Sequence, residues 1–280
     1  MLEQRLLCAG LRFAEAPRWH MDRLWFSDVH DYTLKSVTLA GEVATVARFP
    51  GRPSGLGVLP DGRLLMATAL DCRLWAVTPS GEASEVADLS ALATGLLNDM
   101  VVDGQGRAFV GDTGFRMGAE PPKPGRVIHW RAGQAARVVA EDVTFPNGCV
   151  ITPDGGRYLV AETMAQRISA FTVATDGSLG DRSVFVTLDS PPDGLCMDAD
   201  GALWVGLPLK GEFVRIGPDG GVLQRLASAA PFAVTCALGG PERRTLFLCS
   251  AFTDLQRLGR GETTARIDAC DAPAPGVGWP

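Results

Sequence analysis

Short apolar runs alternate with tight turns along the whole chain. In the clearest example, Phe-Pro-Asn-Gly at 145–148 leads into an apolar run, and Asp154-Gly155 then turns the chain toward the next one. An Asp-Gly turn between two apolar runs is typical of a β-hairpin. Asn147 lies just before a run that is expected to be buried, where an amide is costly unless it has a polar partner.

The same unit recurs six times. Each copy reads as an apolar strand, a turn, an aromatic-rich strand, a loop, a third strand, a turn and a fourth strand. The aromatic-rich or apolar second strands are Leu24–Asp28, Arg63–Ala67, Ala108–Asp112, Tyr158–Glu162, Ala202–Gly206 and Thr245–Cys249. Units that begin about 40 to 50 residues apart, with four strands each, are the signature of a β-propeller. The sequence therefore predicts an all-β fold, a six-bladed β-propeller with four-stranded blades, as a single domain over residues 1–280; one helical turn is expected between Ala87 and Leu97.

In four of the six units a polar side chain stands at the start of the first strand, which lines the central channel of a propeller. These residues are Glu15, Asn98, Asn147 and Asp193. The second unit has Ser54 at this place, and the sixth has Ala233 or Val234. Two carboxylates and two amide oxygens form an all-oxygen set that suits Ca²⁺ or another hard divalent cation. We therefore expect one divalent metal ion at the channel mouth.

These segments resemble the regucalcin (senescence marker protein)/gluconolactonase family over nearly the whole chain. The matching phrases are residues 14–19 with 24–28, 97–99, 145–148, 192–195, and 239–241 with 245–247. The resemblance implies a six-bladed propeller with one divalent metal in the channel and, typically, hydrolysis of lactones. Position by position, it implies that Glu15, Asn147 and Asp193 are metal ligands. Asn98 would be a fourth ligand, or a contact to water and substrate at the metal.

The chain departs from the family pattern at two places. Ala16 stands where a glycine usually follows the first glutamate, and Leu96 stands where relatives that hydrolyse sugar lactones often carry an arginine. The loss of that cation favours a substrate less polar than an aldonolactone. The loop from Thr113 to Lys123 is expected to overhang the channel, where Phe115 and Arg116 would contact the substrate.

The predicted chemistry is ester hydrolysis at the metal. A channel cation would polarise the lactone carbonyl and lower the pKa of water. Asp193 would then act as the catalytic base for the attacking water, and Asn98 would orient that water or the carbonyl. Each of the four residues also has a structural alternative, as a turn cap or a solvated strand start. A serine hydrolase is not expected, because the chain has no Gly-x-Ser-x-Gly segment.

Charge and composition limit the kinds of partner and cellular location that we expect for this protein. The net charge is −6 and no basic run stands out, which argues against nucleic acid or an anionic membrane as partner. No stretch of about 18 apolar residues and no signal-peptide pattern is present, so we expect a cytoplasmic protein. The seven cysteines are an odd number without a Cys-x-x-Cys pair, as expected for buried reduced thiols.

The leading hypothesis is thus a metal-dependent lactonase with a small-molecule lactone as substrate. Ca²⁺ is the favoured cofactor, and Zn²⁺, Mn²⁺, Mg²⁺ and Fe²⁺ are also compatible with an all-oxygen set. One alternative keeps the metal and changes the reaction, to phosphotriester hydrolysis or to isomerisation or hydration of a small carbonyl compound. Another is a metal-binding propeller without catalysis. The oligomeric state stays open.

Overall fold

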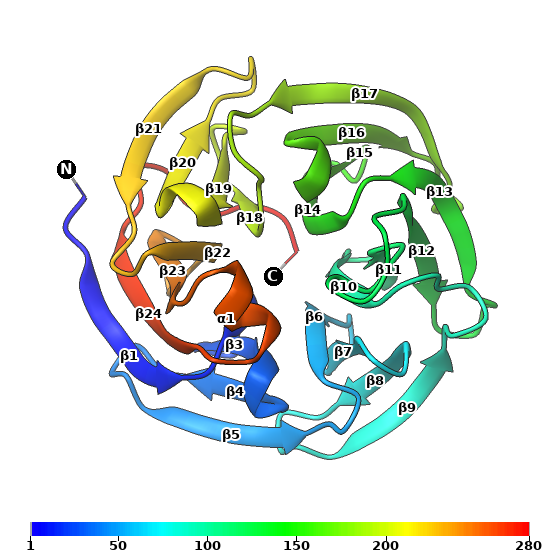
Figure 1. The fold of residues 1–280 in the computed structure, drawn as a ribbon, viewed down its shortest axis with the longest axis horizontal. Helices are drawn as coiled ribbons and strands as arrows, with labels where there is room; N and C mark the ends of the chain where they lie inside the picture. Colours follow the sequence, from blue (N-terminus) through cyan, green and yellow to red (C-terminus); the bar gives the residue numbers. More distant parts are fainter. Residues whose placement is uncertain (1, 280) are drawn as a thin grey trace.

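The computed structural model describes residues 2–279 as six four-stranded antiparallel sheets arranged as blades around a central axis (Figure 1). The predicted six-bladed β-propeller with four-stranded blades is confirmed. Blades 1 to 3 consist of β2 (Ala14–His20), β3 (Arg23–Asp28), β4 (Thr33–Val37) and β5 (Val43–Arg48); β6 (Pro53–Val58), β7 (Leu64–Thr68), β8 (Arg73–Val77) and β9 (Ala83–Asp88); and β10 (Leu97–Val102), β11 (Arg107–Asp112), β12 (Gly125–Arg131) and β13 (Arg137–Val143).

Blades 4 and 5 follow the same order from the axis outward. They consist of β14 (Pro146–Ile151), β15 (Arg157–Glu162), β16 (Arg167–Val173) and β17 (Leu179–Thr187), and of β18 (Leu195–Met197), β19 (Leu203–Leu207), β20 (Glu212–Ile216) and β21 (Val222–Ala227). Short 3-10 turns η1 (Val29–Asp31), η2 (Thr163–Ala165) and η3 (Pro208–Lys210) join the second and third strands of blades 1, 4 and 5.

The sixth blade closes the ring with strands from both ends of the chain. It contains β22 (Phe232–Gly239), β23 (Thr245–Phe252) and β24 (Thr264–Asp271), and its outer strand is β1 (Arg5–Leu11), which pairs antiparallel with β24. The sequence repeat did not predict this closure, because β1 precedes the first recognisable unit. Pairing the two termini removes an open sheet edge and joins the first blade to the last.

Helix is almost absent from the described residues. The one α-helix is α1 (Leu255–Gly259), in the connection between β23 and β24. It begins at Asp254, whose side chain accepts hydrogen bonds from the backbone N–H groups of Gln256 and Arg257. Between Ala87 and Leu97 the expected single turn is present: the Ala93 N–H donates to the Leu89 carbonyl at 2.9 Å, and the rest of the stretch ends β9 and begins β10. None of the helices among residues 2–279 is long and apolar enough to cross a membrane.

The core lies between the blades. Second-strand residues such as Phe26, Phe109, Trp204 and Phe247 are fully buried, so the aromatic residues of the repeat serve packing as predicted. All seven cysteines are free and six of them are buried. Each blade buries its faces against both neighbours, which fixes the inner strands β2, β6, β10, β14, β18 and β22 in contact around the axis.

Candidate active site on the upper face

The inner strands of five blades carry a β-bulge near their start. Register shifts fall between Glu15 and Arg18, Pro53 and Leu56, Leu97 and Met100, Pro146 and Cys149, and Ala233 and Thr235. A bulge adds an unpaired residue, bends the strand and turns a side chain away from the regular alternation. Three of the predicted ligands, Glu15, Asn98 and Asn147, lie in these bulged segments. We call the face of the ring at which these strands begin the upper face.

A buried carboxylate holds the segment just before each of these three ligands. The carboxylates are Asp28, Asp112 and Glu162, each the last residue of the second strand of its blade. They accept backbone N–H groups from Phe13 at 2.7 Å, Gly95 at 2.7 Å and Thr144 at 2.8 Å, respectively. Sequence reasoning missed this role. Its signal was present, because an acidic residue ends the second strand in units 1, 3 and 4 only.

The two predicted amide ligands are tied down through their nitrogen atoms. Asn98 Nδ2 donates to the Pro146 carbonyl of the next blade at 3.0 Å. Asn147 Nδ2 donates to Thr163 Oγ1 at 3.1 Å, and that hydroxyl donates in turn to the Pro192 carbonyl at 2.8 Å. These bonds orient both side chains and leave both amide oxygens uncommitted by them.

Asp193 is positioned by one backbone bond to the preceding blade and one within its own blade. The Gly148 N–H donates to its carbonyl at 3.2 Å, and its own N–H donates to the Gly206 carbonyl at 2.9 Å. The glycines allow this close approach: a Cβ on Gly148 would lie 2.5 Å from Leu195 N. The Asp193 Oδ1 atom is buried and has no hydrogen-bond partner among residues 2–279.

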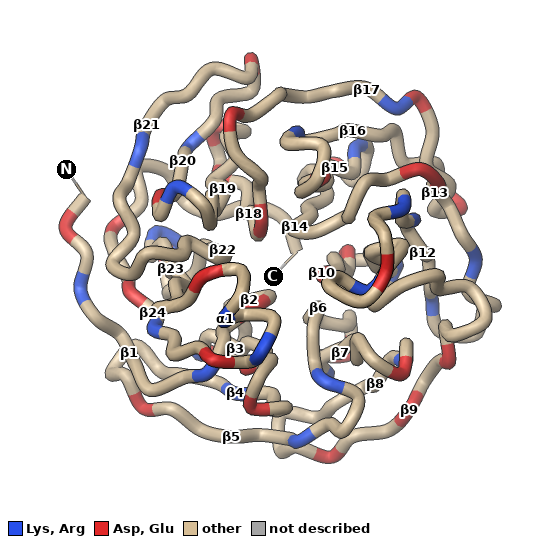
Figure 2. The backbone as a smooth tube through the Cα atoms, in the orientation of Figure 1, with Lys and Arg blue, Asp and Glu red and all other residues tan. Residues whose placement is uncertain are grey.

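The electrostatics show that acidic groups converge near the axis. Burial, and then the charges of Asp193 and Asp99, raise the pKa of Glu15 well above its usual value. Burial raises the pKa of Asp193 to about 7; the adjacent Asn147 amide opposes this rise and the charge of Asp99 adds to it. Figure 2 shows acidic segments close to the axis beside β2 and β18. These carboxylates are therefore costly to ionise together without a cation.

Asp99 is a third carboxylate in this group, and sequence reasoning gave it no role. It is 7% exposed, and burial raises its pKa. Arg18 reaches it from blade 1 at 3.3 Å and also donates to the Met100 carbonyl at 2.6 Å. Because Asn98 and Asp99 are consecutive, regular alternation would send them to opposite faces of the strand; the bulge in β10 changes that.

The donor set fits a hard divalent cation. Asp193 offers a buried oxygen without a partner, Glu15 lies within its electrostatic influence, and Asn98 and Asn147 offer uncharged oxygens. Two carboxylates with neutral oxygens suit Ca²⁺ or a similar ion. No group of three or more His, Cys, Asp or Glu side chains with metal-binding geometry occurs among residues 2–279, so binding at this site would depend on the amides.

Comparison with known proteins decides the family. Residues 13–252 match the family described as the SMP-30/Gluconolactonase/LRE-like region. The chain belongs to this family.

Its relatives are distant in sequence and close in fold. The pentonolactonase XacC of Haloferax volcanii is 26% identical over 276 residues, covering 91% of this chain and 87% of that protein. Regucalcin of Gallus gallus is 26% identical over 268 residues, covering 91% and 82%. A solved regucalcin from Agrobacterium tumefaciens, described as a calcium-binding protein, superposes with a TM-score of 0.81 at 21% identity, covering 100% of this chain and 98% of that one; this likeness shows the fold.

Of the two residues predicted to contact substrate, Phe115 is buried and Arg116 is exposed. Phe115 is 2% exposed and packs on Phe145, with ring centroids 5.7 Å apart. It therefore supports the segment that leads to Asn147, and a direct substrate contact stays a prediction. Arg116 is exposed in the same loop, and a contact between Arg116 and substrate likewise stays a prediction. Asp154 accepts a backbone N–H within its hairpin, as the sequence predicts for this turn, and Asp61 and Asp103 do the same in theirs.

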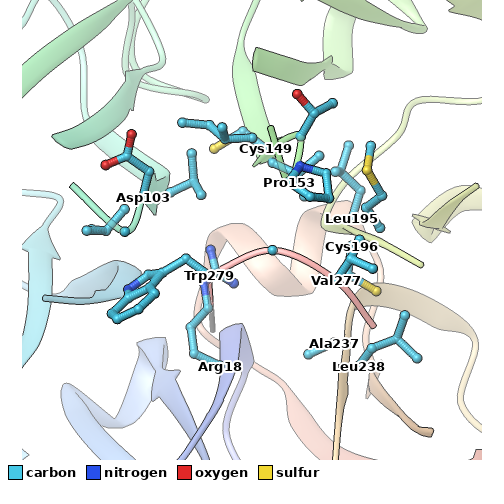
Figure 3. Close-up of a pocket in the computed structure, with 18 of the residues that line it drawn as sticks. Arg18, Asp103, Cys149, Pro153, Leu195, Cys196, Ala237, Leu238, Val277 and Trp279 are labelled. Carbon is cyan, nitrogen blue, oxygen red and sulfur yellow. The ribbon is translucent and has the colours of Figure 1, made fainter. Parts of the chain in front are cut away.

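A separate cavity of about 490 Å³ lies at the other end of the axis (Figure 3). It is lined by the far ends of the inner strands and by the C-terminal segment, in which Trp279 Nε1 donates to the Val58 carbonyl at 2.7 Å. Arg18, Cys149 and Cys196 also line it, whereas Glu15, Asn98, Asn147 and Asp193 do not. His20 belongs to this end as well, with Nε2 3.0 Å from the Gly62 carbonyl oxygen.

Proposed function

We propose that this chain is a metal-dependent lactonase that opens a cyclic ester with water on its upper face. The observation that carries the proposal is the buried, unpartnered Asp193 Oδ1, which lies close enough to Glu15 for each ionisation to oppose the other. Family membership supports the reaction class, since a relative that matches nearly the whole chain is named a pentonolactonase. Glu15, Asn147 and Asp193 would hold the cation, with Asn98 as a fourth ligand or a substrate contact.

A bound divalent cation would supply Lewis-acid polarisation of the ester carbonyl and acidify water. The chain's own residues then have separate tasks. Asp193 would take the proton of the attacking water, with a carboxylate of raised pKa suited to proton transfer near neutral pH. Asn98, fixed through Nδ2 to the Pro146 carbonyl, would orient the water or the carbonyl oxygen. The products are the hydroxyl and carboxylate of the opened ring.

Ca²⁺ is the cation we favour, because all four donors are oxygen atoms and two are neutral amides. A solved structure of the same fold is described as a calcium-binding protein. Zn²⁺, Mn²⁺, Mg²⁺ and Fe²⁺ are tested beside it. The cytoplasmic location also stays a prediction.

The test measures metal content and lactone hydrolysis together. Wild-type protein stripped by a chelator is expected to lose turnover of a lactone panel and to recover it when Ca²⁺ or another divalent ion is restored. Asn147→Ala and Asp193→Ala are expected to lose both metal and turnover while staying folded. Asp154→Ala, in an exposed hairpin, is the matched control and is expected to keep both. Undiminished hydrolysis by the stripped protein would refute metal dependence.

The uncharged residue Leu96 is a reason to test other reactions in the same experiment. Leu96 lies at the start of the β10 segment, where it offers no charge to a polar sugar ring. The panel therefore includes a phosphotriester and a small carbonyl compound beside the lactones. Metal binding without turnover of any of these would favour a non-catalytic propeller.

A further inference from the structure

Arg52 occupies a special place on the upper face. It lies in the connection between β5 and β6, directly before the inner strand of blade 2 and two residues before Ser54. Ser54 is the blade 2 counterpart of the ligand positions, so Arg52 stands at the rim of the candidate active site. Figure 2 shows a basic segment on the stretch that leads into β6.

The Arg52 guanidinium has no hydrogen-bond or ion-pair partner among the residues that the structure describes. Its Nε is buried and forms no hydrogen bond with any of residues 2–279, and none of their carboxylates forms an ion pair with it. Two arginines that are more deeply buried differ: Arg107 pairs with Asp103 at 2.6 Å and Arg215 with Asp198 at 2.7 Å. A partly buried cation without a counter-ion is unfavourable unless a ligand supplies one.

Asp71 does not pair with Arg52. It packs against Gly51, where a Cβ would lie 2.1 Å from its Oδ1, and that oxygen is buried without a hydrogen-bond partner among residues 2–279. Burial lowers the pKa of Arg52, and the Tyr32 phenol is the group that opposes this effect. An arginine side chain nevertheless stays protonated at neutral pH, so Arg52 can pair with an anionic group.

The backbone fixes Arg52 in a conformation that favours glycine. Its φ is +64°, in the left-handed region. The Ala69 N–H donates to its carbonyl at 2.8 Å, and its own N–H donates to the Phe49 carbonyl at 3.4 Å. The backbone at this position is therefore anchored from both sides, and it would accept a glycine without strain.

His30 extends the same patch. Burial lowers its pKa, and the positive charges of Arg52 and Arg12 lower it further. Its ring meets Phe13 edge-on at 5.7 Å, two residues before Glu15. The acidic neighbour is Asp28, which already accepts Lys35 Nζ at 2.6 Å and the Phe13 N–H at 2.7 Å. Asp28 is thus already engaged, and none of the carboxylates of residues 2–279 forms an ion pair with Arg52.

We propose that Arg52, with His30 beside it, is an anion-binding subsite that selects lactones carrying a carboxylate. This inference rests on the lactonase function proposed above and names its substrate class. A guanidinium binds a carboxylate through two parallel N–H donors, and the histidine ring supplies a further N–H. The subsite offsets the absence of charge at Leu96, because it places the cation on blade 2 at the same rim. The upper face then holds the ester and its anionic substituent in separate places.

The test compares a charged lactone with its neutral ester. The substrates are 5-oxotetrahydrofuran-2-carboxylate and its methyl ester, with the metal restored. Wild-type protein is expected to prefer the carboxylate, and the ratio of the two kcat/KM values is expected to fall about 10- to 100-fold in Arg52→Gln. Arg52→Lys should keep part of the preference. Arg63→Gln, which removes one positive charge from an exposed turn at the other end of the axis, should keep the wild-type ratio.

A second variant and a binding measurement keep the outcome decisive. Arg52→Gly removes the side chain and relieves the positive φ, so it is expected to fold with an unfolding temperature no lower than wild type. Calorimetry measures binding of the hydroxy-dicarboxylate product, 2-hydroxyglutarate. The affinity for this product is expected to fall about 10-fold or more in Arg52→Gln and in Arg52→Gly. An unchanged selectivity ratio or unchanged product affinity would overturn the subsite. If neither lactone is hydrolysed, the proposed function fails, and calorimetry still decides for or against the anion site.

Discussion

Replacing Glu162 with glutamine is expected to destabilise blade 4 through the loss of one buried charge. The Glu162 side chain is 0% exposed. It accepts Arg167 Nε at 2.9 Å, Arg182 Nη2 at 2.7 Å and the Thr144 N–H at 2.8 Å, and it also accepts the Ser169 hydroxyl. A glutamine retains one acceptor oxygen and turns an amide group toward donors, so several of these bonds are lost.

The size of the effect follows from the pKa. Burial alone would raise the pKa of Glu162, but hydrogen bonds from Arg167, Ser169, Thr144 and Arg182 outweigh it and lower the pKa from 4.5 to about 2. At 1.36 kcal/mol per pKa unit this difference corresponds to about 3 kcal/mol of folding stability. A loss of that size would lower the unfolding temperature by on the order of 5 °C for a chain of this length.

The pH dependence has a defined sign. Because the folded-state pKa is lowered, the stabilisation is complete at pH values well above 4.5 and is lost as pH falls toward about 2. Urea unfolding followed by tryptophan fluorescence is run from pH 7 to pH 3 on wild type and Glu162→Gln. The difference in free energy of unfolding is expected to be about 3 kcal/mol at pH 7 and about half of that at pH 3.

An exposed glutamate provides the control. Glu141 lies on β13 with a side chain that is 70% exposed, 3.9 Å from Arg126. Glu141→Gln is expected to change the free energy of unfolding by less than about 0.5 kcal/mol at any pH. A loss below about 1 kcal/mol for Glu162→Gln at pH 7, or a difference that stays constant down to pH 3, would refute the pKa argument.

Two further predictions concern the upper face and the ring closure. In metal-free protein at pH 8, Asp193→Asn is expected to raise the unfolding temperature by a few degrees, because it removes a buried carboxylate whose pKa is raised to about 7. The same variant should gain no thermal stability from Ca²⁺. Equal Ca²⁺ stabilisation of wild type and variant would contradict the assignment of Asp193 as a ligand. Leu11→Ala, at a β1 position that is 3% exposed, is expected to cost about 2 to 5 kcal/mol in urea unfolding, whereas Leu6→Ala on the same strand, 55% exposed, should cost less than about 1 kcal/mol. Similar losses for the two would show that β1 does not pack into the sixth blade.

The fold could be predicted from the sequence because the repeat is local. Each unit carries its own hairpin turns and aromatic strand, and six units fill one ring. The places of Glu15, Asn98, Asn147 and Asp193 followed from the same repeat, since equivalent positions in a propeller must face the axis. Their roles as ligands remain a proposal.

Other features depended on contacts between distant residues. The pairing of β1 with β24 joins the two ends of the chain, and no repeat signal marks a strand that precedes the first unit. Asp99 entered the acidic group through a bulge that only the strand register reveals. The supporting roles of Asp28, Asp112 and Glu162 required knowing which backbone N–H groups they meet.

The sequence by itself determined the number of blades, their hairpins and the polar residues at the strand starts, because periodicity and turn chemistry are properties of short segments. Only the tertiary structure decided which charges have partners. Among residues 2–279, Glu162 is fully paired, whereas Asp193 Oδ1 and Arg52 Nε have no hydrogen-bond partner, although all three are charged residues in or beside β-strands. The reason is physical: the free energy of a charge depends on its burial and on neighbours from other blades, and these are set only when the ring closes.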